Sequence, residues 1–316
     1  KGREVMHEAL FYDKLPGSRV RCRTCQWRCR INPERFGVCG MYQNGNGVLY
    51  NLNYGRVSSV AADPIEKKPL FHFHPGTFVY SLGTWGCNFH CRHCQNWQIS
   101  CMTPPFLERG SRKMSPQAAI DQAKLNYCKG LAWTYNEPTV WFEYTLDSAK
   151  LAKENDLYTV YVTNGYMTPE ALDMIGPYLD AFSLDVKGFS DRFYKELTRV
   201  AKWRGILEVA ERAKEKWGIH VEVVTNIIPG MNDDEEQLEG LATWIRDKLG
   251  DMTPWHVTRA NPTHQMRDFP ATPVPTLERA YEIGKRVGLR FVYLGNVPGA
   301  RHEHTFCYNC GNVVIE

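Results

Sequence analysis

From about residue 77 onward, short apolar runs alternate with longer stretches in which apolar residues recur every three or four positions. The short runs predict buried strands, and the longer stretches predict helices that pack one face on a core. Strands that alternate with helices over short connections lie parallel, and six or seven such units close wholly or partly into a barrel. The predicted fold class is therefore α/β, a partial (β/α)6-type TIM barrel. The expected strands are 78–82, 131–135, 158–163, 181–186, 219–227, 255–258 and 290–294. The expected helices are 115–127, 139–155, one that begins at Pro169, 190–199, 203–217, 233–249 and 276–287.

The residues that precede this alternation are expected to form a small accessory region. They include a turn-rich segment at 43–47 and two short β-like runs at 48–53 and 57–61. Asparagine and glycine in the first of these segments favour a turn. The predicted parts of the chain are a cysteine-rich accessory region at 1–75, the barrel at 76–300 and a C-terminal CxxC tail at 301–316.

Composition narrows the class of protein without identifying it. The 316 residues are 43% hydrophobic, and 38 basic against 35 acidic residues give a net charge of +3. This balance is too even to predict a nucleic-acid or membrane-surface partner, and no apolar run approaches the ~20 residues that cross a bilayer. The first residue is Lys1, so we expect that a few residues precede it, and no signal-peptide pattern is visible. We expect a cytoplasmic protein.

Eleven cysteines are many for such a chain, and nine of them lie in three clusters. In the absence of a secretion signal, closely spaced cysteines more often bind metal or carry out redox chemistry than form disulfides. The clusters are Cys22, Cys25, Cys29 and Cys39 near the N-terminus, Cys87, Cys91 and Cys94 in the middle, and Cys307 and Cys310 near the C-terminus.

The central cluster follows the first barrel strand directly, with the spacing C-x3-C-x2-C. Thiolates are the usual ligands of iron–sulfur clusters, and three of them leave one iron of a four-iron cubane without a protein ligand. A small molecule can coordinate at such an open position. We therefore predict a [4Fe–4S] cluster at Cys87, Cys91 and Cys94, with a structural zinc site or free buried thiols as the alternatives.

Polar residues also follow the other predicted strands. Sites on parallel-strand barrels lie at the carboxyl ends of the strands, so these residues are candidates for binding and catalysis. They are Asn136 and Glu137, Thr163 and Asn164, Asp185 and Lys187, Asn226, and the segment from His256 to Arg259.

The cysteine motif and its place resemble those of the radical SAM superfamily. The resemblance implies that the open iron binds the amino and carboxylate groups of S-adenosylmethionine. One electron then cleaves the sulfonium and yields a 5′-deoxyadenosyl radical, which makes Cys87, Cys91 and Cys94 the catalytic residues. It also implies that His93 takes the place of an aromatic residue that packs near adenine.

Residues 133–138 resemble the Gly-Gly-Glu-Pro motif of the family, with Tyr135 and Asn136 in place of the glycines and Glu137 retained. The resemblance implies that Asn136 and Glu137 bind the methionine amine, and a carboxylate beside an ammonium is a favourable pair. The alternative is a helix N-cap region that favours an acidic residue.

Residues 162–165 resemble the Asp-Thr-Asn-Gly turn of glycyl-radical activating enzymes, with Val162 in place of the aspartate. The resemblance implies that Asn164 contacts the cofactor, although asparagine followed by glycine also forms ordinary turns.

Residues 184–189 resemble the Asp-Leu-Lys segment of the same enzymes. Asp185 and Lys187 either pair with each other or bind cofactor and substrate. Lys187 and Arg259 are the expected substrate contacts.

Residues 223–233 resemble the fifth-strand region of the family, which packs on adenine, and Asn226 is the expected cofactor contact there. Residues 254–257 resemble the sixth strand, in which a histidine approaches the cofactor. The same resemblance assigns His256 to cofactor binding, while a lone strand histidine is often structural.

Four segments, 63–70, 94–97, 296–299 and 307–311, resemble the radical SAM protein of the AmmeMemoRadiSam system, a relative of the pyruvate formate-lyase activating enzymes. The resemblance implies hydrogen abstraction from a protein or small-molecule substrate, an electron donor such as flavodoxin or ferredoxin, and partner proteins of the same system. Activation of a glycyl-radical enzyme is an alternative within this chemistry. A zinc-ribbon interaction protein is the alternative of another class.

The N-terminal cysteines have the spacing C-x2-C-x3-C-x9-C and could form a second metal site without other ligands. Alternatively, Cys22 and Cys25 combine with Cys307 and Cys310 in the manner of a zinc ribbon. The second site could hold zinc or a second iron–sulfur cluster, and disulfides or free thiols are the remaining interpretation.

Overall fold

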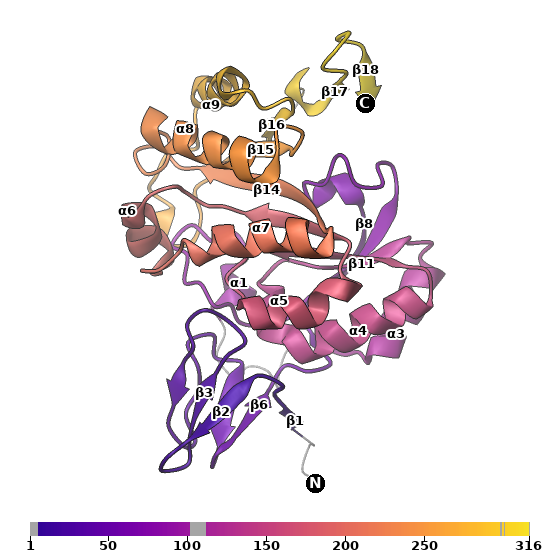
Figure 1. The fold of residues 1–316 in the computed structure, drawn as a ribbon, viewed down its shortest axis with the longest axis vertical. Coiled ribbons are helices and arrows are strands. Elements are labelled where there is room, and N and C mark those ends of the chain that lie inside the picture. The colour runs from indigo at the N-terminus through magenta and orange to yellow at the C-terminus, as the bar shows by residue number, and fades with distance from the viewer. Residues whose placement is uncertain (1–5, 102–111, 298, 300, 316) are drawn as a thin grey trace. The chain divides into compact units, whose positions relative to one another are not determined.

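A computed structural model describes residues 6–101, 112–297, 299 and 301–315 (Figure 1). Contacts within the chain divide it into two compact units, and each is described separately below. Unit 1 comprises Lys1–Asp63, Phe78–His90 and Asn96–Asp180, and unit 2 comprises Pro64–Thr77, Cys91–Gln95 and Ala181–Glu316.

Unit 1 begins with two small antiparallel sheets, each of three strands. Their shared core contains Val20, Ile31, Tyr42 and Leu49, all buried. One sheet has the order β1-β6-β5, formed by His7–Glu8, Val48–Asn51 and Tyr42–Gly45. The other has the order β2-β3-β4, formed by Tyr12–Leu15, Arg19–Cys22 and Arg30–Ile31. The sequence predicted only the β6 strand, because β1 to β4 are short and contain charged residues. The turn predicted at 43–47 is confined to Asn46 and Gly47, since residues 43–45 belong to β5.

The larger sheet of unit 1 has the strand order β8-β9-β11-β12, in which β8 runs antiparallel to β9 and the other three strands are parallel. Leu82 of β9 pairs with Trp133 of β11, and β11 pairs in parallel with β12. These strands are Ser59–Pro64, Phe78–Gly83, Gly130–Trp133 and Tyr158–Thr163. A separate antiparallel pair joins β7 (Arg56–Val57) to β10 (Arg112–Lys113).

Two helices of unit 1, Pro116–Leu125 and Pro169–Ile175, start where the sequence predicted, whereas Trp97–Ser100 and Gly176–Tyr178 were not predicted. The Ser115 hydroxyl accepts the Ala118 N–H, and Pro116 follows as the first helical residue, an arrangement that stabilises a helix N-terminus. Thr168 caps the next such helix in the same way. The helices are α1 (Trp97–Ser100), α3 (Pro116–Leu125), η3 (Pro138–Trp141), α4 (Phe142–Glu154), α5 (Pro169–Ile175) and η4 (Gly176–Tyr178), with α3 and α4 side by side in Figure 1.

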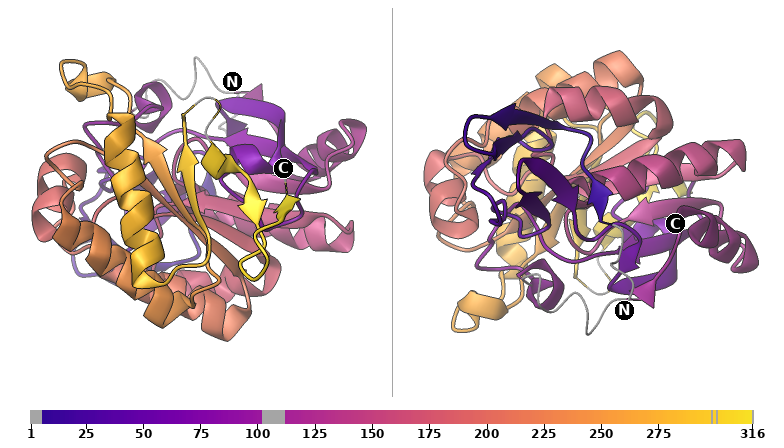
Figure 2. Two further views of the ribbon diagram at one scale, coloured as in Figure 1. Left: turned by 90° about the horizontal axis from the view of Figure 1, so that it is seen from above. Right: turned by 90° about the horizontal axis from the view of Figure 1, so that it is seen from below.

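Unit 2 contains four parallel strands in the order β13-β14-β15-β16, formed by Ala181–Asp185, His220–Ile227, Trp255–Arg259 and Val292–Gly295. Figure 2 shows α9 (Val274–Val287) lying along β15 and β16. The other helices are η1 (Ile65–Lys67), α6 (Asp191–Phe193), η5 (Tyr194–Thr198), α7 (Gly205–Trp217), α8 (Glu235–Trp244), η6 (Ile245–Leu249), η7 (His264–Met266) and η8 (Arg301–Glu303). A hairpin of β17 (Thr305–Phe306) and β18 (Val313–Ile315) ends the unit.

Two expected helices differ from their predicted form. The helix predicted at 233–249 changes from α-helix to a π-helical turn at Ile245, and this wider turn keeps Ile245 and Leu249 buried. The helix predicted at 190–199 is a short α-helical turn followed by a π-helical turn, and Arg199 ends it with φ of 62°. In the described part of the chain, no helix combines the length and apolarity needed to span a membrane.

Candidate metal centre

The loop after β9 carries Cys87, and Asn136 holds its start. The Asn136 side-chain oxygen accepts the Thr84 N–H at 3.0 Å, and its Nδ2 donates to the Gly86 carbonyl at 2.7 Å. The Phe89 N–H then donates to Cys87 Sγ at 3.4 Å. A backbone amide directed at the sulfur stabilises a thiolate, so this loop is suited to bind metal.

Asn88 connects this loop to two other segments of unit 1. Its Oδ1 accepts a hydrogen bond from Asn164 Nδ2 at 2.8 Å, and its carbonyl accepts one from Trp27 Nε1 at 2.7 Å. Asn88 Nδ2 is buried and has no hydrogen-bond partner among the described residues. The sequence analysis did not identify Asn88 or Trp27, and only their positions between spaced cysteines could have indicated a role.

Glu137 follows β11 and is 3% exposed. Its Oε1 accepts the Thr139 N–H at 3.0 Å and the Thr139 and Thr163 hydroxyls at 2.6 and 2.7 Å. Its Oε2 accepts the Asn164 N–H at 2.8 Å. Burial raises the pKa of Glu137, and these hydrogen bonds only partly oppose the rise. All four donors are neutral, so a cationic group of a ligand would gain a charge-assisted partner here.

The structure confirms the N-cap interpretation of this segment, because Glu137 is the N-cap of η3. Tyr135, which replaces a family glycine, has φ of 73°, a left-handed conformation that glycine adopts more easily. Its hydroxyl donates to Asp63 at 3.2 Å, and its carbonyl accepts from Asn96 Nδ2 at 2.6 Å. The strand predicted to reach residue 135 therefore ends at Trp133.

Cys91 and Cys94 lie on a short segment of unit 2, where the Cys94 N–H donates to the Cys91 carbonyl at 3.3 Å. His93, between them, packs against Phe193 with ring centroids 6.0 Å apart. Burial, with a smaller effect of the Lys187 charge, lowers the pKa of His93 to about 3. Its Nδ1 is buried and has no hydrogen-bond partner among the described residues. A neutral ring with an available nitrogen is suited to contact a nucleobase.

Asp185 and Lys187 form the ion pair that the sequence offered as one interpretation, with Oδ2 and Nζ 2.8 Å apart. Burial opposes the charge of Lys187, but Asp185 and the nearby sulfurs of Cys91 and Cys94 reverse the effect, and its pKa is raised. The pair therefore places a positive charge beside two cysteines of the motif.

The other predicted site residues of unit 2 hydrogen bond to neighbouring groups. Asn226 Nδ2 donates to the Thr258 hydroxyl at 3.0 Å, and Arg259 Nε donates to the Thr272 carbonyl at 2.9 Å. A buried hydrogen bond of 2.7 Å joins His256 Nε2 to Glu222. The sequence analysis did not identify Glu222, because an acidic residue inside a predicted strand carries no motif.

In unit 1, Asn136 thus hydrogen bonds to Gly86 before Cys87, and Asn164 joins Glu137 to Asn88 after it. Unit 2 gathers Cys91, His93, Cys94, Asp185 and Lys187. Asn226, His256 and Arg259 have the separate partners given above.

The comparisons with known proteins identify the family of this chain. A family model described as "Radical SAM superfamily" matches residues 82–245, which is more than half of the chain. The chain belongs to the radical SAM superfamily. It is an enzyme of the superfamily that uses a [4Fe–4S] cluster and S-adenosylmethionine, so the zinc-ribbon interaction protein is not supported. The carboxylate of Glu137 and the buried nitrogen of His93 fit these cofactors.

Two relatives show which members of the superfamily this chain is similar to. An uncharacterized protein of Methanocaldococcus jannaschii is 45% identical over 98% of this chain and 91% of its own length. The pyruvate formate-lyase-activating enzyme of Clostridium pasteurianum is 24% identical over 59% of this chain and 81% of its own length. The predicted similarity to these activating enzymes is confirmed.

A solved structure shares the fold. A radical SAM methyltransferase from Sphaerobacter thermophilus superposes with a TM-score of 0.55 at 15% identity, over 77% of this chain and 72% of that protein. The predicted α/β fold of the radical SAM type is confirmed.

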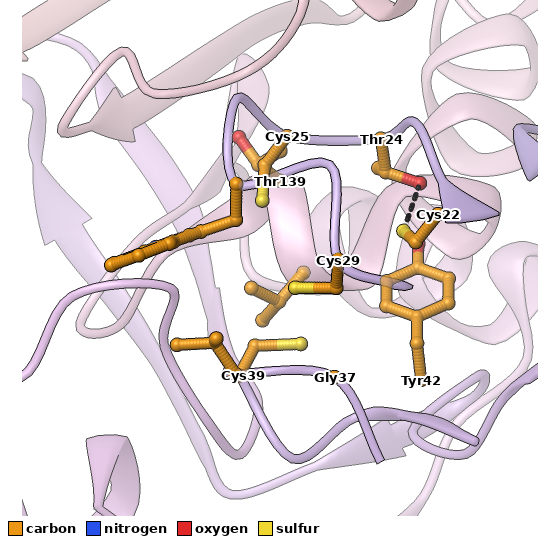
Figure 3. A pocket seen from close by; sticks show the side chains of 11 residues that line it. Cys22, Thr24, Cys25, Cys29, Gly37, Cys39, Tyr42 and Thr139 are labelled. Atoms are coloured by element: carbon orange, nitrogen blue, oxygen red, sulfur yellow. Dashed lines mark hydrogen bonds between the residues drawn. The ribbon is translucent and has the colours of Figure 1, made fainter. Parts of the chain in front are cut away.

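The remaining cysteines lie in different surroundings. Cys22, Cys25, Cys29 and Cys39 line one pocket in unit 1, and Figure 3 shows their side chains around it. In unit 2, Cys307 is partly exposed and Cys310 is exposed. Hydrogen bonds from the backbone of Cys310 and Asn309 lower the pKa of Cys307.

Proposed function

We propose that this enzyme reductively cleaves S-adenosylmethionine at a [4Fe–4S] cluster bound by Cys87, Cys91 and Cys94. The cluster supplies one electron to the cofactor, and the resulting 5′-deoxyadenosyl radical abstracts hydrogen from a protein or small-molecule substrate. The main support is the buried Glu137 carboxylate, which has only neutral donors and follows β11, next to the strand that leads to Cys87.

The residues of unit 1 would bind the methionine part of the cofactor. Glu137 would accept hydrogen bonds from the ammonium group, because its negative charge has no cationic side chain beside it within the described residues. Asn136 would hold the Cys87 loop in place through Thr84 and Gly86. Asn164 would join Glu137 to Asn88, so the loop and the ammonium site would be held together.

The residues of unit 2 would bind the rest of the cofactor and the substrate. His93 would contact adenine through its ring and its buried Nδ1. Lys187, with its charge fixed by Asp185, would contact the cofactor carboxylate or an acidic substrate group. We assign Asn226 and His256 to supporting roles near the cofactor and Arg259 to substrate binding.

The AmmeMemoRadiSam branch remains our proposal for the closer relationship. It rests on segments such as 63–70 and 307–311, and Pro298 of the segment 296–299 lies outside the described residues. Activation of a glycyl-radical enzyme is the second candidate, which the 24% identity to a pyruvate formate-lyase-activating enzyme favours. A flavodoxin or ferredoxin would deliver the electron, in the cytoplasm. We also propose that the chain consists of an accessory region that ends at residue 75, a barrel that ends at residue 300 and a C-terminal tail.

The test is anaerobic reconstitution of the full chain with iron and sulfide, followed by S-adenosylmethionine and a reductant. We expect absorbance near ~400 nm and release of 5′-deoxyadenosine. The Cys91→Ser variant should lose deoxyadenosine formation, whereas Cys101→Ser, outside the motif, should retain it. Cleavage by Cys91→Ser would show that the cluster is assigned to the wrong cysteines.

A second experiment separates the two substrate classes. The reconstituted enzyme is incubated with each candidate partner protein encoded near it and examined by electron paramagnetic resonance. A glycyl-radical signal on a partner would establish the activase. If a small molecule is consumed, deoxyadenosine forms and no radical signal appears on a protein, the result would support hydrogen abstraction from a small-molecule substrate.

A further inference from the structure

The four N-terminal cysteines surround a pocket whose wall is mostly apolar. Cys22 ends β3, and the other three lie in the loops that follow before β5. Figure 3 shows sulfurs from separate turns of the chain directed toward the same space. The lining also includes Trp27, Val38, Tyr42, Thr139 and Val140.

Each of the four thiols has a backbone amide directed at its sulfur, from Thr24, Trp27, Val38 and Met41 in turn. None of the four, all within the described residues, forms a disulfide. Cys22 Sγ donates a weak hydrogen bond of 3.6 Å to the Thr24 hydroxyl, and the Met41 N–H approaches Cys39 Sγ at 3.5 Å. Backbone amides directed at sulfur are typical of metal-bound thiolates.

The arrangement of the sulfurs distinguishes between the possible metal groups. A single zinc ion requires four sulfurs at about 2.3 Å from one point. In the described part of the chain, no three cysteine, histidine or carboxylate side chains are arranged to hold one metal ion. The four cysteines instead line a pocket, as expected when the ligands are separated by a cluster with volume of its own.

We propose that Cys22, Cys25, Cys29 and Cys39 bind a second [4Fe–4S] cluster, in which a cysteine is the ligand of each of the four irons. Four thiolates occupy all four irons, so this cluster has no open position for a small molecule. The C-terminal pair is not needed for it, because the N-terminal set already provides four ligands in one unit. The proposal does not depend on the function assigned to Cys87, Cys91 and Cys94.

The loops of this site contact both neighbours of Cys87. Trp27, between Cys25 and Cys29, donates its indole N–H to the carbonyl of Asn88. On the other side, a Cβ added to Gly86 would lie 2.7 Å from the Cys39 carbonyl oxygen. The proposed cluster would therefore be held beside the loop that carries the first ligand of the other cluster.

The test uses the full-length chain with Cys87, Cys91 and Cys94 all changed to alanine, reconstituted anaerobically with iron and sulfide. We expect about four irons and four sulfides per chain, with absorbance near ~400 nm, and about eight irons in the unchanged protein. Zinc at about one per chain without iron, or no metal at all, would overturn the proposal. Because this variant lacks the other site, its iron content does not depend on cofactor cleavage.

The matched control changes Cys307 and Cys310 to serine in the otherwise unchanged chain. We expect it to keep about eight irons, and a fall to about four would show that the C-terminal pair supplies ligands, against the proposal. An unchanged protein that cleaves S-adenosylmethionine with only about four irons would overturn the second cluster and leave the proposed function intact.

Discussion

Two buried carboxylates, one in each unit, show how the same side chain serves different purposes. Glu137 of unit 1 is 3% exposed and Glu222 of unit 2 is also almost completely buried. Only neutral groups donate to Glu137. Glu222 contacts His220 at 2.9 Å and His256 at 2.7 Å, and it accepts the backbone N–H groups of Phe71 and His72.

The two environments move the pKa in opposite directions. Burial dominates at Glu137 and raises its pKa. Burial also opposes ionisation at Glu222, but hydrogen bonds and charge from His220 and His256 outweigh it, and the pKa is lowered. A carboxylate with imidazole partners acts as a structural anchor, while one with only neutral donors can still gain a cation.

The largest expected effect on stability is that of Glu222→Ala. It would leave the buried imidazole of His256, the partly exposed imidazole of His220 and two backbone amides without their carboxylate partner, so the free energy of unfolding should fall by about 3–5 kcal/mol. Urea denaturation measures this change. Glu278→Ala, an exposed carboxylate on α9, is the control and should change stability by less than about 0.5 kcal/mol. If Glu222→Ala and Glu278→Ala lowered the free energy of unfolding equally, Glu222 would not be a structural anchor.

The next effect concerns cofactor binding. Glu137→Gln removes the charge that would pair with the ammonium group, and a hydrogen bond to a charged group contributes about 1.5–3 kcal/mol. The affinity for S-adenosylmethionine should therefore fall by roughly 10- to 150-fold, measured by equilibrium binding to the reconstituted enzyme.

Glu143→Gln is the matched control for this binding experiment. Glu143 is also a buried carboxylate of unit 1 with neutral donors, the Leu10 N–H at 2.9 Å and the Tyr42 hydroxyl at 2.8 Å. It joins the N-terminal sheets to α4, so its variant should lose stability and keep the cofactor affinity. If both variants lost affinity alike, Glu137 would have no special role in binding.

The pH dependence of unfolding should differ in sign between the two sites. The lowered pKa of Glu222 makes its contribution full above the unfolded pKa of about 4.3, and the contribution is lost as pH falls below it. Glu137 has a raised pKa, so the folded state gains stability relative to Glu137→Gln as pH falls through that pKa. Unfolding of wild type, Glu222→Gln and Glu137→Gln from pH 7 down to about 2 tests both signs, because the Glu222 contribution is lost only below the unfolded pKa, and parallel curves would contradict them.

The smallest expected effect on stability is that of changing a third carboxylate, which is paired with a cation but is not buried. Glu170 accepts two hydrogen bonds from Arg28 Nη2, at 2.9 and 3.0 Å, but its side chain is 41% exposed. Exposed pairs contribute about 0–1 kcal/mol, so Glu170→Gln should change the unfolding free energy within that range. A loss as large as that of Glu222→Ala would show that pairing alone, without burial, accounts for the difference.

Local patterns predicted much of the fold. Apolar runs located the parallel strands, and residues such as Ser115 and Pro169 marked helix starts, because these signals depend on near neighbours in sequence. The cysteine motif predicted the family for the same reason. Glu222 and Asn88 were not identified, since their roles come from partners far away along the chain. Tyr135 was placed in a strand, because nothing in its side chain indicates a left-handed backbone.

Gly86 has a consequence for how a change at one cysteine loop would reach the other. It has φ of 78°, and any side chain there would meet Met41 at 2.5 Å as well as the Cys39 carbonyl. The turn before Cys87 and the segment 39–41 are therefore packed so closely that a side chain at position 86 would displace both loops at once.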